Sequence, residues 1–318
     1  MKKRAIAVLT ASFIAVSSLT GCGATTESVV NGMFSEKALS SSNESSYDVG
    51  VEVNYQGAGL KFGVNGDFDY QYEMKSEEDM TGHAVLTANL EIPELLSGFL
   101  PQTDFMGELY TEKEGEEITQ YISDQKSKKW KMNKADSIPV DTENVKRIIE
   151  AYKNILLEKA ELQDKTVEVD GETCYELAVE MSGDDLSEIL GMIYDIAKDP
   201  VENRMANSSS SGIKYIQRNK SLPDKDEFLE IASYAVIKMN LYVSKKTGCL
   251  VRSEVDCGDT DLGAMIFTAL EQRGTDISYL GNFDADDIKI TNFTLSTVHM
   301  DPGSTTVNIP DEVKENAE

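Results

Sequence analysis

The feature that most constrains this chain is a set of long segments in which apolar and polar residues alternate. From Tyr47 to Tyr55 the odd-numbered residues are apolar, and the same period of two returns at 60–72 and 84–92. Successive side chains of a strand point to opposite faces, so this period is typical of strands with one buried face. Strands this long suit a curved antiparallel sheet.

Shorter strands and their turns continue this pattern along the chain. We expect them at 107–112, 118–123, 129–132, 166–169, 175–181, 235–243, 251–255 and 288–295. Asp170-Gly171 separates two of them and is a strong hairpin signal. The last segment changes phase, which predicts a β-bulge near Thr291 and Asn292.

Three segments follow a helical period instead: 145–156, 186–197 and 262–270. Asp141 and Thr142 are possible N-caps of the first helix, and Ser182 with Asp185 resembles a capping box for the second. Helices inserted between antiparallel strands, without regular strand–helix alternation, predict an α+β fold.

The first 21 residues have the layout of a secretory signal peptide: three basic residues at 2–4, an apolar stretch from 5 to about 16, and a small-residue exit. The stretch is shorter than the ~20 residues that cross a bilayer. Its end, Leu19-Thr20-Gly21-Cys22, resembles the lipobox of bacterial lipoproteins. That resemblance implies that residues 1–21 are removed and that Cys22 carries a diacylglycerol. An ordinary secretory signal with a chance cysteine is the alternative.

Composition separates a tether from a folded body. Residues 22–45 are small and polar and predict a flexible tether from the lipidated Cys22, followed by one domain over 46–318. The chain has 30 basic and 56 acidic residues, a net charge of −26. Such a body is repelled by nucleic acid and by anionic lipid. We therefore expect no nucleic-acid partner, and attachment to the extracytoplasmic face of the cell membrane through the diacylglycerol on Cys22.

Three cysteines remain after Cys22: Cys174, Cys249 and Cys257. If the last two lie on one strand they are about 26 Å apart, whereas a disulfide needs α-carbons within about 7 Å. Any disulfide must then involve Cys174. Three buried free thiols are an equal alternative.

The order of elements resembles that of Gram-positive surface lipoproteins similar to the LolA, LppX and LprG superfamily. The resemblance covers about 46–317 and rests on the hairpin at 171–177, the strand and turn at 241–248, and the ending at 307–313. It implies an unclosed half-barrel of antiparallel strands wrapped around two or three amphipathic helices. It also implies that acyl chains or whole lipids bind in the apolar space between sheet and helices.

Inward-facing strand residues are the candidate ligand-lining set: Phe62, Val64, Phe68, Tyr70, Leu86 and Leu90. Apolar residues of this kind line most small-molecule pockets, although ordinary core packing explains the same pattern. His83 and His299 fit no metal or nucleophile pattern and are expected to be solvated. The acidic runs at 256–261 and 284–287 lack the spacing of a calcium loop. We expect neither an enzyme nor a metal or cofactor.

These patterns leave three functional hypotheses. The first is a membrane-anchored lipoprotein that holds a lipid or another apolar ligand between sheet and helices. The second is a non-catalytic envelope scaffold, and the third is a solute-binding lipoprotein of a transporter. The polar stretch from Asn203 to Lys225 is expected to be a mobile loop, and its few apolar residues are a candidate lid.

Overall fold

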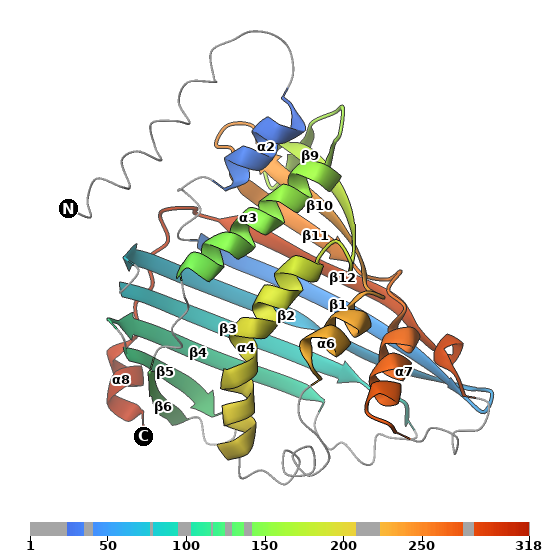
Figure 1. The fold of residues 1–318 in the computed structure, drawn as a ribbon. Coiled ribbons are helices and arrows are strands. Elements are labelled where there is room, and N and C mark those ends of the chain that lie inside the picture. Colours follow the sequence, from blue (N-terminus) through green and yellow to red (C-terminus); the bar gives the residue numbers. More distant parts are fainter. Residues whose placement is uncertain are drawn as a thin grey trace.

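The protein forms one twelve-stranded antiparallel sheet that does not close (Figure 1). The computed structural model describes residues 24–34, 41–76, 79–94, 103–115, 117–124, 129–136, 142–207, 223–275 and 283–317. The strand order is β6-β5-β4-β3-β2-β1-β12-β11-β10-β9-β7, with β8 paired to β9. The predicted α+β class and the unclosed antiparallel sheet are therefore confirmed.

The longest strands, β1, β2, β3 and β12, lie side by side in the middle of the sheet. The strand bounds are β1 Ser41–Tyr55, β2 Ala58–Ser76, β3 Asp79–Glu91, β4 Asp104–Glu114, β5 Glu117–Asp124, β6 Lys129–Asp136, β7 Glu161–Leu162, β8 Val167–Val169, β9 Glu172–Ser182, β10 Val236–Ser244, β11 Leu250–Asp256 and β12 Ile288–Met300.

The local signals for turns and bulges are confirmed. Asp170 and Gly171 both have positive φ, 51° and 84°, as a tight two-residue hairpin requires. Gly50 pairs with Asn292 while the next residue, Val51, pairs with Ile290, so Thr291 is the extra residue of the predicted bulge.

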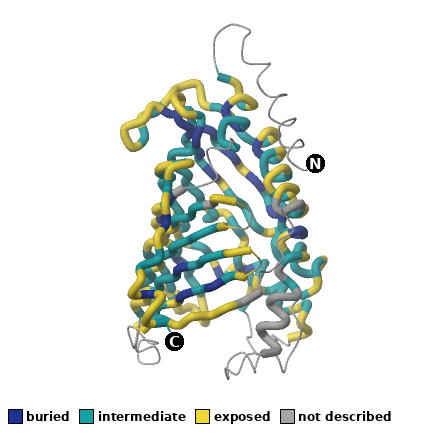
Figure 2. Tube along the Cα trace, turned by 90° about the vertical axis from the view of Figure 1, so that its left-hand side faces the viewer, coloured by how far each residue is buried: buried dark blue, intermediate teal, exposed yellow. Residues whose placement is uncertain are grey.

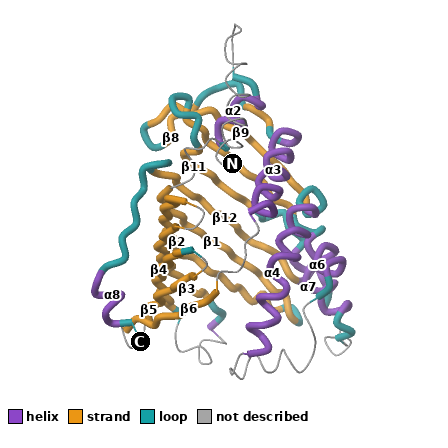
Figure 3. Tube along the Cα trace, turned by 60° about the vertical axis from the view of Figure 1, so that its left-hand side comes forward, coloured by secondary structure: helices purple, strands orange, loops and turns teal. Residues whose placement is uncertain are grey.

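Five helices lie on one face of the sheet (Figures 1 and 3). They are α2 Thr26–Met33, α3 Thr142–Lys159, α4 Ser187–Asn207, α6 Lys225–Ala232 and α7 Leu262–Gln272. We call this the inner face and the opposite one the outer face. The three predicted helices correspond to α3, α4 and α7. None of the described helices is long and apolar enough to cross a membrane.

The predicted flexible tether at 22–45 is wrong over the part that the structure describes. Helix α2 lies within it, with a capping box between Thr25 and Ser28, and β1 begins at Ser41 instead of 46. Val29 and Val30 are buried among residues of α3 and the sheet. The short run of apolar residues at 29–30 is a weak periodic signal, and tertiary packing stabilises this helix. Cys22 and the signal peptide lie outside the described residues.

The predicted loop at 203–225 is also partly wrong. Helix α4 continues to Asn207, and α6 begins at Lys225 with Asp224 and Glu227 as its capping box. Residues 208–222, including most of the candidate lid, lie outside the described residues.

The core lies where the helices meet β9, β10 and β11. Its buried residues come from α2, α3, β9 and β10, among them Val30, Leu156, Leu177 and Val243, and β11 contributes partly buried residues. Figure 2 shows this concentration of buried residues near α2. A second, small cluster joins Tyr110, Tyr121 and Val313. It is formed by α8 (Asp311–Asn316), which packs on the outer face near β4, β5 and β6 (Figure 3).

The three described cysteines are free thiols, so no disulfide involves Cys174. Ser244 pairs with Cys174 on one side and bonds to the carbonyl of Cys249 on the other. One strand position therefore separates the two buried thiols. Burial raises the pKa of the Cys174 thiol, which makes it a poor nucleophile.

Candidate functional site

One row of directly paired residues crosses the inner face from the core to the far side of the sheet. In strand order it is Leu177, Leu241, Ser253, Thr297, Ser45, Phe68, Leu86 and Gly107. The two ends of this row differ in exposure: Leu177 is 0% and Leu241 2% exposed, whereas Phe68 and Leu86 are 39% and 44% exposed. The helices thus cover one half of the inner face and leave the other half open.

The open half carries several exposed apolar side chains on neighbouring strands. We call these the open apolar patch: Phe68, Tyr70, Leu86, Phe105 and Ile122, from β2 to β5. Register places all five on the inner face. The rings of Phe68 and Tyr70 stack with centroids 6.2 Å apart, and burial raises the pKa of Tyr70. Single exposed apolar residues are ordinary, whereas large contiguous apolar patches mark interaction sites.

Two glycines lie in the open half, and each has a different surrounding. A Cβ at Gly107, directly opposite Leu86, would meet no atom within 4 Å. Gly66 permits a close approach instead, since a Cβ there would lie 2.0 Å from the Thr87 carbonyl oxygen and 2.8 Å from the Tyr47 hydroxyl. That hydroxyl donates to the Thr87 carbonyl at 2.6 Å. The floor of the open half is therefore uneven, with large side chains beside small ones.

The helices diverge from this half of the sheet. In α3, Leu156 is fully buried against β9, whereas Ile149, seven residues earlier on the same helical stripe, is 45% exposed. In α4, Ile189 is buried and Ile193 is exposed one turn later. Figure 3 shows α3 and α4 to one side of β2–β6. In both helices, the apolar stripe therefore continues past the residues that pack in the core.

A group of polar residues lies between the covered half and the open half in two neighbouring rows of the inner face. We call them the polar seam: Asn43, Ser45, Ser253, Thr297 and His299. The hydroxyls of Ser45 and Thr297 lie 3.0 Å apart. His299 Nδ1 lies 2.7 Å from Asn43 Oδ1, and its Nε2 lies 3.3 Å from the Ser253 hydroxyl. This seam runs along β11, β12 and β1.

The prediction that both histidines are solvated is wrong, because each side chain is only partly exposed and contacts other side chains. His299 is mostly buried in the polar seam, and burial lowers its pKa. His83 stacks on Tyr110 with centroids 4.2 Å apart, and its Nε2 lies 2.9 Å from a Glu108 carboxylate oxygen. His83 belongs to the outer face and contributes to the packing of the Tyr110 cluster.

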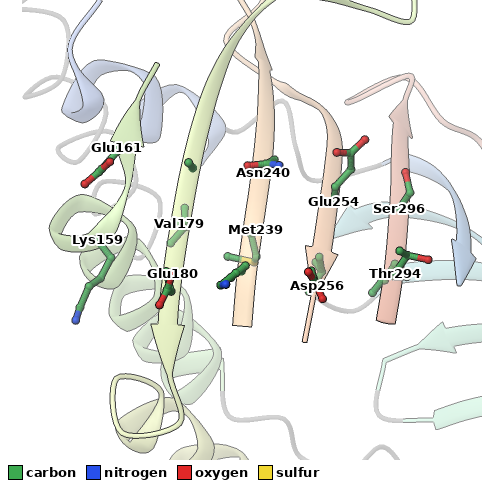
Figure 4. Close-up of a pocket in the computed structure, with 14 residues that line it drawn as sticks. Lys159, Glu161, Val179, Glu180, Met239, Asn240, Glu254, Asp256, Thr294 and Ser296 are labelled. Atoms are coloured by element: carbon green, nitrogen blue, oxygen red, sulfur yellow. The ribbon is translucent and has the colours of Figure 1, made fainter. Parts of the chain in front are cut away.

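A second hollow lies on the outer face across β9 to β12 (Figure 4). It measures about 810 Å³ and its side chains include Glu161, Glu180, Glu254 and Asp256. Its two lysines are already paired, Lys159 with Asp185 and Lys238 with Asp259. A net acidic wall of this kind is unsuited to an acyl chain. Among the described residues no cluster of metal-ligating side chains occurs.

The structure places all six predicted ligand-lining residues on the inner face. Phe68 pairs with Leu86 and Val64 with Leu90, while Phe62 pairs with Val51 and Tyr70 with Asn43. Phe68, Tyr70 and Leu86 are exposed and the other three are half-buried. Sequence reasoning missed Phe105 and Ile122. The alternation Phe105-Gly107-Leu109 is a signal that extends the predicted strand by two residues and includes Phe105.

Comparisons with known proteins add little to this description. No family model matches the chain, and no curated protein is similar to it in sequence. Among solved structures, it is similar to LprF from Mycobacterium bovis with 9% identity, a TM-score of 0.37, and coverage of 90% of this chain and 96% of that one. A beta-barrel-like DUF1849 protein from Brucella abortus also has 9% identity, with a TM-score of 0.24 and coverage of 82% and 96%. These likenesses are too distant to support a functional argument.

Proposed function

We propose that this protein is a lipoprotein of the cell envelope that binds the acyl part of a lipid, or a similar apolar ligand, on the open half of its inner face. The observation that carries the proposal is the open apolar patch, whose members Phe68, Leu86 and Phe105 are each about 40% exposed. An acyl chain laid on it removes apolar surface from water, at about 25 cal/mol per Å².

The shape of the molecule supports an elongated ligand. The patch crosses four strands, which is about 14 Å at a strand spacing of about 4.8 Å. The exposed stripe residues Ile149 and Ile193 lie on the helices that diverge from it. For the open apolar patch, whose members are Phe68, Tyr70, Leu86, Phe105 and Ile122, we propose a binding role without catalysis.

Attachment to the membrane forms the second part of this proposal and rests on the lipobox at 19–22. Two acyl chains on Cys22 provide a durable anchor, because each buried CH₂ contributes about 0.8 kcal/mol. Cys22→Ala removes the thiol that accepts the diacylglycerol. The variant is expected to incorporate no labelled fatty acid and to leave the membrane fraction. Normal lipid labelling of the variant would contradict the anchor.

The binding proposal is tested by three neighbouring substitutions on β4, two on its inner face and one on its outer face. Phe105 is 43% exposed on the inner face and Met106 is 53% exposed on the outer face. Fluorescence titration with N-phenyl-1-naphthylamine, an uncharged apolar probe, is expected to saturate with the wild-type protein. Phe105→Asp and Gly107→Phe should lose most of this binding, because one adds a charge to the patch and the other fills its space. Met106→Asp should keep it.

Equal probe binding by all four proteins would contradict an inner-face site. Absence of binding by the wild type, with a reproducible cross-linked protein partner in cells, would favour the scaffold hypothesis instead.

A further inference from the structure

The polar seam borders the open apolar patch directly. Ser45 pairs with Phe68, and Asn43 pairs with Tyr70, on adjacent strands of the same face. Side chains in such pairs have β-carbons about 5 Å apart. A ligand whose acyl chain lies on the patch therefore has its other end within reach of Ser45, Thr297 and their neighbours.

The seam offers hydrogen bonds but no charge. Ser45 and Thr297 together have two hydroxyl protons, and their mutual hydrogen bond uses one of them. His299 fits a neutral imidazole, in which Nδ1–H donates to Asn43 Oδ1 and Nε2 accepts from the Ser253 hydroxyl. Burial lowers the His299 pKa and favours the same neutral form.

Charged residues are absent from the described inner-face positions of β1, β2, β3, β9, β10, β11 and β12. Their register assigns no Asp, Glu, Lys or Arg to this face. The inner-face cations of the sheet are at the far side, Lys113 on β4 and Lys129 and Lys131 on β6. A phosphate or carboxylate placed at the seam finds no opposite charge on these seven strands.

We infer that the polar seam holds the headgroup of an uncharged amphiphile, one that presents hydroxyl or ester oxygens, while its acyl part lies on the open apolar patch. This inference rests on the binding role proposed above and specifies its ligand class. Neutral hydroxyls exchange hydrogen bonds with Ser45 and Thr297 at little cost, whereas an unpaired anion pays a large desolvation penalty. Acyl chains alone do not distinguish an uncharged lipid from an anionic one.

The test is competition against bound N-phenyl-1-naphthylamine by two lipids with identical chains, dioctanoylglycerol and dioctanoyl phosphatidic acid. The wild-type protein is expected to release the probe at a concentration of dioctanoylglycerol at least about ten-fold lower than that of the phosphatidic acid. The protein is acidic overall, so the titration is repeated in 0.5 M salt, which screens long-range repulsion. The preference should persist.

Variants of the seam separate local recognition from this general repulsion. Thr297→Val and Ser45→Ala should each weaken competition by dioctanoylglycerol roughly two- to ten-fold, the value of one neutral hydrogen bond, without changing probe affinity. Thr294→Val is the matched control on the exposed outer side of the same strand. Thr294→Val should leave the competition unchanged. Two separate seam variants are used so that the test still holds if one of them disturbs the fold.

Equal competition by the two lipids, a preference that disappears in 0.5 M salt, or seam variants that behave like Thr294→Val would overturn the inference and leave the acyl site intact. Failure of the wild type to bind the probe at all would overturn the binding role and the inference together.

Discussion

The two halves of this sheet have similar patterns and opposite surroundings. On β9 and β10, Leu177 and Leu241 are covered by helices and almost fully buried. On β2 and β3, Phe68 and Leu86 occupy the same row of the same face and remain about 40% exposed. Large apolar residues alternate with polar ones in both places, so alternation identifies the face that avoids water without identifying what covers it.

Apolar side chains therefore have different roles in the two halves. In the covered half they contribute to folding, because burial there is complete. In the open half their apolar surface is still in contact with water, so a ligand that covers this surface gains binding free energy. The polar seam marks the boundary, and the helices diverge from the sheet beyond it.

The largest expected effect is a difference in stability between matched leucines. Leu177→Ala should lower the free energy of unfolding by about 2–5 kcal/mol, because it leaves a cavity in the core. Leu86→Ala should lower it by about 1 kcal/mol or less, since the side chain is 44% exposed. Urea unfolding monitored by circular dichroism measures both. Similar losses would mean that the two halves are packed alike.

The sequence alone predicts the elements of both halves and not their difference. The alternation at 60–72 places Phe68 and Tyr70 on one face, and the stripe at 145–156 places Ile149 with Leu156. Whether helix and sheet meet depends on the angle at which they pack, and no local pattern encodes that angle. Helix α2 shows the same limit, since Val30 is buried by contacts with distant segments.

The polar seam could not be predicted from the sequence, because its residues are far apart along the chain. Ser45 and Thr297 are 252 residues apart, and Asn43 and His299 are 256 apart. Each residue alone resembles a solvated strand position. The pairing of β1 with β12 brings them together, and the sequence gives no direct sign of which strands pair.

An intermediate effect on stability is expected at the ion pair between Lys159, at the end of α3, and Asp185. Lys159 Nζ lies 2.7 Å from Asp185, whose carboxylate also accepts from the Ser182 N–H, and these contacts lower the Asp185 pKa to about 2. Because the folded pKa is below the ordinary value of 3.8, the stabilisation is present above pH 4 and is lost as the pH falls toward 2.

Asp185→Asn should therefore cost about 1 kcal/mol at pH 7, a modest value because the pair is partly exposed. The difference in unfolding free energy between wild type and variant should shrink between pH 4 and pH 2. A difference that is the same at pH 7 and at pH 2.5 would show that the carboxylate charge is not responsible.

The smallest expected effect concerns His299 at the boundary. Burial lowers its pKa in the folded protein, so the unfolded chain binds the proton more readily below about pH 6.5. Stability should decrease slightly as the pH falls below that value. His299→Gln should remove this part of the decrease in stability. NMR titration of the histidine rings should give a midpoint below pH 6.5 for His299. The His83→Gln variant assigns the two ring signals. A midpoint at or above 6.5 would show a solvated or charged imidazole.

The most direct test of the open half is to locate the ligand itself. The purified protein is incubated with a diacylglycerol that carries a photoreactive diazirine in one acyl chain, irradiated and digested, and the labelled peptides are identified by mass spectrometry. Labelling is expected within 60–72, 84–92 and 104–122, which contain the open apolar patch, and Gly107→Phe should reduce it. Labelling concentrated on the outer hollow at 238–256, or spread evenly over both faces of the sheet, would contradict a ligand site on the inner face.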